Sequence, residues 1–434
     1  MRNKIPFAVC LGVLALAPLG LLAVDQKTSL RIDQEIEKAR PEIIKIRRFI
    51  HMNPELSNRE YETAKLVASK LTSLGLEVKT GVARTGVVGL LRGGQPGPTV
   101  AIRADMDGLP IQEATSVPFK SLNPGAMHAC GHDVHTSVAL GAAMVLVKVK
   151  DKIKGNIKFI FQPAEEGAPQ GEEGGAELMI KEGVLENPTV GAIFGLHVWP
   201  ENVGQVYFST GNIMAGSDSF EIQIKGRSAH GARPHEGVDA IVLAAEVISA
   251  LQSVVSRAVD PTDPAVLTIG KIQGGTRSNI LAEKVTLEGT VRALSDVNRK
   301  KIPQLIESVV KGITQAFGGS SSLDYRQSNP PVFNHPEFGE TMRPTLVGVL
   351  GKDKVLPLPP QMVSEDFSSY AQRIPGFFFF LGVKTPGQAV AAPLHNPNFL
   401  PDERSIPVGI KLMCHLALDA LEKQNPPEAE PPSL

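Results

Sequence analysis

The stretch Met127-His-Ala-Cys-Gly-His-Asp133 places a thiol, Cys130, two residues before an imidazole, His132. An apolar segment with helical spacing, Val134–Val149, follows directly, and strand-like apolar runs lie on both sides. Alternating strands and helices are typical of an α/β layer with a mainly parallel sheet. The sequence therefore predicts an α/β fold in which a tight turn at Gly131 precedes a helix and aims both side chains the same way.

Three of the predicted strands end shortly before polar side chains. These side chains are Asp105 and Asp107 after the first strand, Glu165 and Glu166 after the second, and His197 after the third. Ligands of open α/β sheets bind outside the carboxyl ends of the strands. We therefore expect the three strand ends to contribute to one site.

Donors of the kind that bind a borderline-soft metal are spread along the chain. They are Cys130, His132, the pair Glu165-Glu166, His197 and His395. Thiolate, imidazole and carboxylate groups are the donor set of zinc. Because the donors outnumber the three that one open catalytic zinc needs, the count predicts two ions with a bridging ligand, and a hydrolase.

Taken singly, each donor has an ordinary structural interpretation: a buried thiol, a helix-cap histidine, a solvated acidic loop or a core histidine. Only their combination favours a metal site. Three neighbouring polar residues are expected to support the ligands rather than to bind a metal: His128, Asp133 and His135.

Length and composition indicate a globular protein of two domains, or of one domain with an insertion. The chain has 434 residues, of which 42% are apolar and 21% charged, and its net charge is -1. This balance gives no electrostatic reason to expect nucleic acid or an anionic membrane as a partner. Substrate preference must then come from groups in the pocket.

The N-terminal segment 1–24 has the layout of a secretory signal peptide. Arg2 and Lys4 precede an apolar run that ends at Ala23, and polar sequence begins at Asp25. We expect cleavage after Ala23 and export to the periplasm or out of the cell, with a retained membrane anchor as the alternative. We expect no other segment to be long and apolar enough to cross a bilayer.

Two cysteines remain once Cys10 has left with this segment. Cys414 lies in a helical pattern and is expected to be a buried thiol. A disulfide between Cys130 and Cys414 is the alternative, although one bridge is a poor framework for a domain that can build its own core.

A self-contained unit is predicted at 216–327, inserted into an α/β domain formed by 30–215 and 328–424. Its strand-helix-strand-strand-helix-strand order is ferredoxin-like. The elements are Phe220–Lys225, Asp239–Val255, Val266–Gly270, Lys284–Arg292, Val297–Phe317 and Ser322–Arg326. The tail 425–434 is proline-rich and is expected to be disordered.

Several motifs together resemble the M20 family of metallopeptidases. They are Arg103-Ala-Asp-Met-Asp-Gly-Leu-Pro110, Met127-His-Ala-Cys-Gly-His-Asp133, Gln162-Pro-Ala-Glu-Glu-Gly167, Gly195-Leu-His197, Ser228-Ala-His230, Ser364-Glu-Asp-Phe367 and Leu394-His-Asn396. Within the family they are most similar to the amidohydrolase branch, which includes hippurate hydrolases, N-acyl-amino-acid amidohydrolases and auxin-conjugate hydrolases. The resemblance implies a dinuclear-metal exopeptidase-like catalytic domain interrupted by a smaller lid or dimerisation domain.

For the metal site, the resemblance implies that Cys130 is the bridging ligand. Glu166 and His395 would complete the shell of one ion, and His132 and His197 that of the other. Two divalent ions per subunit are therefore expected, with zinc as the first choice and manganese, cobalt or nickel as alternatives.

For catalysis, the resemblance implies that Glu165 is the general base and that Asp107 is a carboxylate supporting a ligand. Asp105 stands where the family motif has a metal-binding histidine. This departure fits the amidohydrolase branch, in which His132 takes over as ligand.

For the substrate, His230 resembles the group that reaches the substrate carbonyl, across a dimer interface. Asn279 and Arg292 resemble groups that hold the substrate, and Arg292 suits a carboxylate. The resemblance thus also implies a homodimer formed through the inserted unit.

The reaction implied is metal-dependent hydrolysis of the amide bond of N-acyl or aryl-acyl amino acids, which releases the acid and the free amino acid. A metallo-exopeptidase acting on short peptides is the alternative. A non-catalytic binding homologue would have a broken donor set, whereas every expected donor is present here. A zinc deaminase would need a Pro-Cys-x-x-Cys run, which the sequence lacks.

Overall fold

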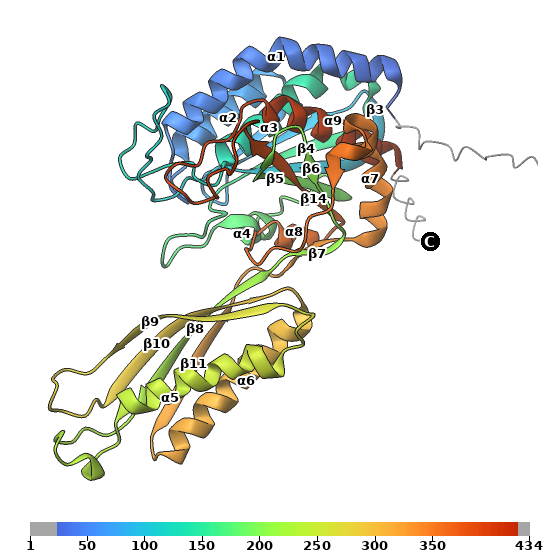
Figure 1. Ribbon diagram of the computed structural model, residues 1–434. Helices are drawn as coiled ribbons and strands as arrows, with labels where there is room; N and C mark the ends of the chain where they lie inside the picture. The colour runs from blue at the N-terminus through green and yellow to red at the C-terminus, as the bar shows by residue number, and fades with distance from the viewer. Residues whose placement is uncertain (1–23, 424–434) are drawn as a thin grey trace, which may run out of the picture.

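The computed structural model describes residues 24–423, which form two bodies (Figure 1). The larger body, the main domain, contains an eight-stranded sheet, and the smaller one, the inserted domain, contains a four-stranded sheet. The expected signal peptide, apart from Val24, and the expected disordered tail 425–434 lie outside the described residues. The predicted α/β fold class is confirmed.

The sheet of the main domain has the strand order β1-β2-β4-β3-β5-β14-β6-β13. Its strands are β1 Glu77–Val82, β2 Gly86–Arg92, β3 Gln95–Asp105, β4 Lys154–Gln162, β5 Ala192–Asn202, β6 Val206–Tyr207, β13 Val355–Leu356 and β14 Gly376–Lys384. The central strands β4, β3, β5 and β14 pair in parallel, and antiparallel pairs lie toward the edges. The carboxyl ends of β3, β4 and β5 therefore lie on one side of the sheet. β5 extends to Asn202, however, so the prediction that His197 follows the end of this strand was wrong, and His197 lies within it.

Helices cover both faces of this sheet (Figure 1). They are α1 Gln26–Met52, α2 Tyr61–Ser73, α3 His132–Lys148, α4 Gly175–Lys181, α7 Pro336–Leu350, α8 Ser368–Ala371 and α9 Ser405–Lys423. In β14, Phe377 and Phe379 belong to the core that includes α1, α3 and α9. Phe378 and Phe380 belong to the opposite core, which includes α4 and α8. A strand buried on both faces explains the continuous run of phenylalanines.

The inserted domain consists of β8 Gly216–Lys225, α5 Ala240–Ser253, β9 Ala265–Gly274, β10 Lys284–Ala293, α6 Asp296–Ala316 and β11 Ser320–Gln327. Its antiparallel sheet has the order β11-β8-β10-β9, which is the ferredoxin-like arrangement. Alternate residues of β8, such as Phe220, Ile222 and Ile224, are buried in the core with α5 and α6. A two-stranded sheet of β7 Gly211–Met214 and β12 Val332–Asn334 stands where the chain passes between the two domains.

One expectation about membrane spans was wrong, since Ala240–Ala258 is also long and apolar enough to cross a bilayer, with a mean hydropathy of 1.5. Length and hydropathy alone carry little weight for a single helix. Leu243, Val247 and Leu251 of this segment pack into the core of the inserted domain, so its apolar character reflects one buried face.

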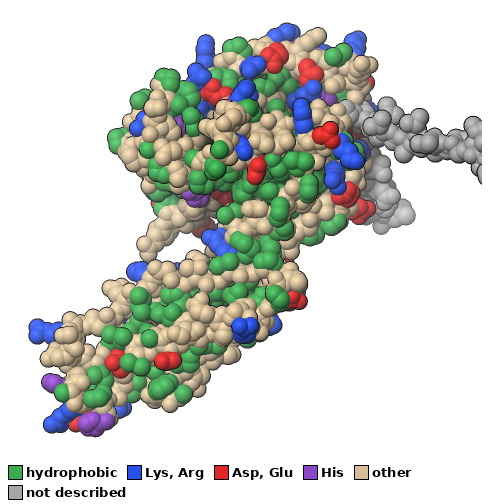
Figure 2. Space-filling view, viewed as in Figure 1, with side chains coloured by type: hydrophobic (Ala, Val, Ile, Leu, Met, Phe, Trp, Pro, Cys, Tyr) green, Lys and Arg blue, Asp and Glu red, His purple; other side chains and the backbone are tan. Residues whose placement is uncertain are grey.

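The two cysteines of the described part, Cys130 and Cys414, are both buried and free, which excludes the alternative disulfide in this structure. On the visible face of the main domain, acidic and basic side chains are interspersed, in keeping with the net charge of -1 (Figure 2).

Candidate metal centre

Cys130 lies between the expected donors. Its Sγ is 3.3 Å from Nε2 of His197 and 3.3 Å from Nε2 of His395. One group of donor atoms within 4.8 Å of one another comprises Cys130, His132 and His197, and a second comprises Cys130, Glu166 and His395. Because the sulfur is common to both groups, the arrangement suits two ions that share it.

The turn at Gly131 holds Cys130 and His132 on the same side. Gly131 has a φ of 90°, in the left-handed region, and it immediately precedes α3. A Cβ atom at this position would lie 2.4 Å from Cγ2 of Val198 on β5. Both the backbone conformation and the close approach to β5 therefore require glycine.

The rings of His132 and His197 present their Nε2 atoms to the site. Nδ1 of His132 is 3.2 Å from Oδ1 of Asp107, and Nδ1 of His197 donates to the carbonyl of Val198 at 2.7 Å. Nε2 of His132 is buried and has no hydrogen-bond partner within residues 24–423. Since each Nδ1 faces an oxygen acceptor, the Nε2 lone pairs remain available for a metal.

Glu166 and His395 meet on the other side of the sulfur. Oε1 of Glu166 is 3.0 Å from Nε2 of His395, yet it has no partner with hydrogen-bond geometry among the described residues. His395 has a φ of 60°, and its backbone N–H donates to the carbonyl of Ala129 at 2.9 Å. Because Oε1 of Glu166 and Nε2 of His395 lie close together without a hydrogen bond, they are well placed to bind the same cation.

Glu165 has the environment of a proton acceptor. Burial raises its pKa well above the ordinary value, and the neighbouring carboxylates Glu365, Glu166 and Asp366 raise it further. Its Oε2 lies 3.8 Å from Nε2 of His132. A carboxylate of raised pKa beside the donor atoms is suited to take up a proton and to release it again.

Burial, together with Glu166 and Glu165, raises the pKa of the Cys130 thiol well above its usual range. A thiolate at this place therefore needs a cation to offset its charge. The donor set fits divalent metal ions for this reason.

Asp105 and His135 are occupied by other contacts. Oδ1 of Asp105 is 2.6 Å from Nδ1 of His135, and Oδ2 accepts from Arg103 at 2.7 Å. Nε2 of His135 accepts the N–H of Val198 at 2.9 Å, so the ring keeps no lone pair for a metal. Asp133 likewise forms buried ion pairs with Arg47 and His51, whereas both ring nitrogens of His128 are buried without a partner in the described chain.

A cavity of about 640 Å³ opens beside these donors. Glu165, Glu166 and His395 line it from the main domain, and Ser217 and Arg292 line it from the inserted domain. Nη1 of Arg292 donates to the hydroxyl of Ser364 at 2.6 Å. The structure thus brings Arg292 to the metal donors across the gap between the domains.

His230 and Asn279 are not brought to this cavity within one chain. The N–H of Gly231 donates to the carbonyl of Asn279 at 2.8 Å, so the two predicted residues are neighbours. They follow β8 and precede β10, at the end of the inserted domain that points away from the main domain (Figure 1). At the usual rise per residue, β8 alone spans about 33 Å between the two ends.

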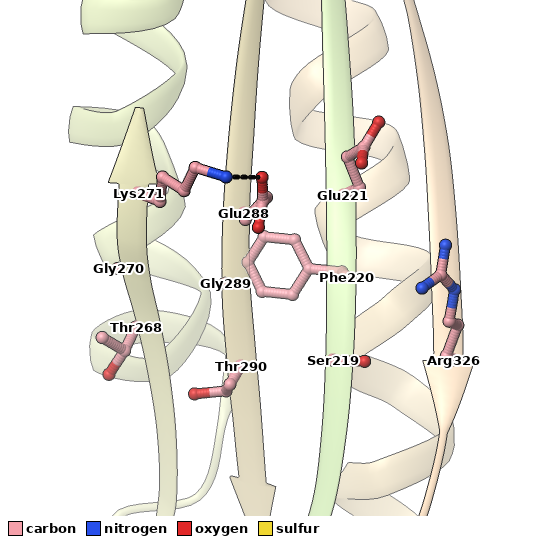
Figure 3. A pocket seen from close by; sticks show the side chains of 10 residues that line it. All are labelled: Ser219, Phe220, Glu221, Thr268, Gly270, Lys271, Glu288, Gly289, Thr290 and Arg326. Carbon is pink, nitrogen blue, oxygen red and sulfur yellow. Dashed lines mark hydrogen bonds and ion pairs between the residues drawn. The ribbon is translucent and has the colours of Figure 1, made fainter. Parts of the chain in front are cut away.

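A second cavity, of about 420 Å³, lies on the sheet of the inserted domain (Figure 3). Lys271 on β9 and Glu288 on β10, which are neighbours on adjacent strands, line it and form an ion pair of 2.6 Å. None of the predicted site residues lines this cavity.

Sequence reasoning missed the residues that hold the donors in place. Arg103 contacts Asp105, Glu365 and Asp366, and Ser57 donates to Oδ2 of Asp107 at 2.8 Å. Arg103, Glu365 and Asp366 stand within the quoted motifs and could have been suspected. No local signal distinguishes Ser57.

Comparison with known proteins agrees with this geometry. The model of peptidase family M20/M25/M40 matches residues 101–419, which confirms the resemblance. A thermostable carboxypeptidase of Saccharolobus solfataricus is 39% identical over 89% of this chain and 98% of its own length. An IAA-amino acid hydrolase of Arabidopsis thaliana is 40% identical over 86% of this chain and 84% of its own length. The crystal structure of a dinuclear metal-binding M20 peptidase of Bacillus subtilis superposes with a TM-score of 0.77, at 34% identity over 89% of this chain and 100% of that chain.

Proposed function

Since the chain belongs to peptidase family M20/M25/M40, we propose that it hydrolyses the amide bond of N-acyl amino acids at a site holding two divalent ions. One observation carries the proposal: Cys130 is shared by two donor groups beside a cavity that also contains Glu165 and Arg292. The products are a carboxylic acid and a free amino acid. Hydrolysis of an amide bond also agrees with the names of the relatives.

Bound divalent ions supply a Lewis acid and a water of lowered pKa. Cys130, His132 and His197 would hold one ion, and Cys130, Glu166 and His395 the other. We propose zinc, because thiolate and imidazole donors suit it, with manganese, cobalt or nickel as alternatives.

Each of the predicted side chains has its own role in the reaction. Glu165 accepts the proton of the attacking water and passes it to the leaving amine. Asp107 keeps the His132 ring oriented through Nδ1. Arg292 binds the carboxylate of the amino acid, for which a guanidinium fork is suited. Asn279 and His230 contact the substrate from a second subunit.

Charges in the cavity favour a blocked amine over a free one. Besides Glu165 and Glu166, the lining carboxylates are engaged: Asp366 accepts from Arg103 at 2.7 Å, and Glu177 pairs with Arg373 at 2.9 Å. The ammonium group of a dipeptide would need a carboxylate partner, whereas an acyl group needs none. This supports N-acyl amino acids over the exopeptidase alternative.

The position of His230 supports association of two copies through the inserted domain. His230 cannot serve its own cavity across the length of β8, so we propose that it serves the cavity of a partner subunit.

The signal-peptide pattern of 1–24 supports export to the periplasm or out of the cell. We expect the exported chain to begin at Val24 when its N-terminus is sequenced.

A hydrolysis screen tests the activity. The metal-reconstituted protein is incubated with N-acetyl, N-benzoyl and indole-acetyl amino acids and with unblocked dipeptides, and release of free amino acid is measured with and without a chelator. We expect chelator-sensitive release from at least one acyl class. Cleavage of dipeptides alone would indicate an exopeptidase, and the absence of turnover in metal-loaded protein would indicate a binding homologue.

A further inference from the structure

Glu60 is a fully buried carboxylate that joins three segments of the main domain. Its Oε1 accepts the N–H of Asn58 at 3.0 Å and the N–H of Ala164 at 2.9 Å. Its Oε2 accepts the hydroxyl of Thr85 at 2.5 Å. The Glu60 side chain thereby connects the segment before α2, the β1–β2 turn and the segment after β4.

Glu60 stands at the N-cap position of α2, but its side chain does not cap the helix. Glu55 performs that role, because its carboxylate accepts the N–H of Glu62 at 3.0 Å and the N–H of Thr63 at 2.9 Å. Loss of the Glu60 carboxylate would therefore leave these first-turn N–H groups bonded. Helix capping does not account for a buried carboxyl group here.

The segment that Glu60 holds is a strained turn. Ala164 has a φ of 53°, in the left-handed region that a residue with a Cβ atom rarely adopts. Such a conformation persists only where its surroundings fix it. The next two N–H groups, of Glu165 and Glu166, donate to the carboxylate of Asp107 at 3.2 and 3.0 Å. Two buried carboxylates thus bind three successive amides of the turn that carries Glu165 and Glu166.

We propose that Glu60 is a positioning residue, which fixes the Ala164 turn so that the Glu165 carboxylate faces the metal donors. This inference rests on the proposed function, in which Glu165 moves the proton. Glu60 does not line the cavity, so it acts on turnover through Glu165 rather than on substrate binding.

The test compares Glu60→Ala and Glu60→Gln with a matched control, Glu62→Ala. Glu62 lies on the first turn of the same helix, is exposed and pairs only weakly with Lys65 at 3.5 Å. We expect Glu60→Ala to lower kcat about 10²-fold with KM unchanged, since a small displacement of a catalytic group has an effect of that order. Glu60→Gln keeps an oxygen for Ala164 and should recover most of the activity, and Glu62→Ala should stay within about twofold of the wild type.

A double-mutant comparison separates positioning from general damage. In a Glu165→Ala background, Glu60→Ala should cause little further loss, because its effect passes through Glu165. An equal loss of kcat in both backgrounds would overturn the proposal.

Hydrogen exchange supplies a readout that is independent of activity. In Glu60→Ala, the amides of 164–167 should lose protection, while those of α2 should keep theirs. Unchanged protection of 164–167 would also overturn the proposal. A wild-type protein without turnover on any acyl amino acid would refute the proposed function instead, and the exchange result would still decide the role of Glu60.

Discussion

Asp107 contacts both the metal-ligand candidate His132 and the turn that carries Glu165 and Glu166. It faces Nδ1 of His132 and accepts from Ser57, from the N–H of Glu165 and from the N–H of Glu166. Burial raises its pKa, but the hydrogen bonds from His132 and the Glu166 N–H outweigh this and keep the pKa below the ordinary value. Asp107 is therefore an ionised acceptor with four donors around it.

The first prediction concerns the substitution Asp107→Asn. An amide would turn one N–H donor toward groups that are themselves donors, so His132 should lose its orientation. We expect metal affinity to fall about 10–100-fold, the usual effect of removing such a partner. Competition with a chelator measures it, and Asp324→Asn, on an exposed carboxylate of β11, is the control. Unchanged affinity would contradict this role.

Glu165 and Glu166 are neighbours with different expected roles, and single substitutions should separate them. Glu165→Ala should retain both ions and lose roughly 10²–10⁴ in rate, the usual share of general acid–base catalysis. Glu166→Ala should lose metal, because a donor on the His395 side is removed. Elemental analysis and kcat are measured on the same samples. Near-normal turnover by Glu165→Ala would exclude it as the base.

At the scale of elements, a buried chain of charges joins α1 to α3. Arg47 and His51 on α1 contact Oδ2 of Asp133 on α3 at 2.9 and 2.8 Å. Nε2 of His51 is 3.3 Å from Oε1 of Glu113, in the loop between β3 and α3. These contacts fix the start of α3, where His132 lies.

This chain of charges predicts a pH dependence of stability. Burial raises the pKa of Glu113, but hydrogen bonds from His51, Thr115 and Ser121 prevail and lower it from 4.5 to about 2. Because the pKa of Glu113 is lower in the folded than in the unfolded protein, its carboxylate stabilises the folded state above about pH 4.5. This stabilisation is lost as the pH falls toward 2.

We therefore expect Glu113→Gln to lower the free energy of unfolding by its full amount above about pH 5, and the difference from wild type to shrink below about pH 4. Urea unfolding of metal-free protein at several pH values measures it, with Glu62→Gln as control. A difference that grew on acidification would show that the sign is wrong.

The elements that the sequence predicted are those whose burial follows a clear period. The apolar run of α3 and the alternation in β8 reflect the buried faces of these elements. β1 was missed because most of its residues are exposed, and β6 and β13 have only two residues each. Pairing of such strands is decided by their neighbours in the sheet rather than by their own sequence.

The same distinction applies to the site. The donors were predicted because thiol, imidazole and carboxylate groups stand in motifs at strand ends. Glu60 was missed, since an acidic residue before a helix indicates a cap, whereas its partner Ala164 is 104 residues away. Contacts of that kind arise only from the folded arrangement.

At the scale of the whole molecule, the inserted domain presents different groups at its two ends. Arg292, near the end of β10, lines the cavity of its own chain. His230 lies beyond the opposite end of β8, and the segment that contains it is exposed. If two subunits pair through this domain, each cavity would receive Arg292 from its own chain and His230 from the partner.

Co-expression of Glu165→Ala and His230→Ala subunits tests this arrangement. Each homodimer lacks one essential group at both sites, so each should be nearly inactive. In a mixed dimer, the His230→Ala subunit keeps its own Glu165 and receives His230 from its partner, so one complete site forms. Random pairing of equal amounts should then restore about a quarter of the wild-type sites. Activity no higher than that of the two homodimers would show that His230 does not act across subunits.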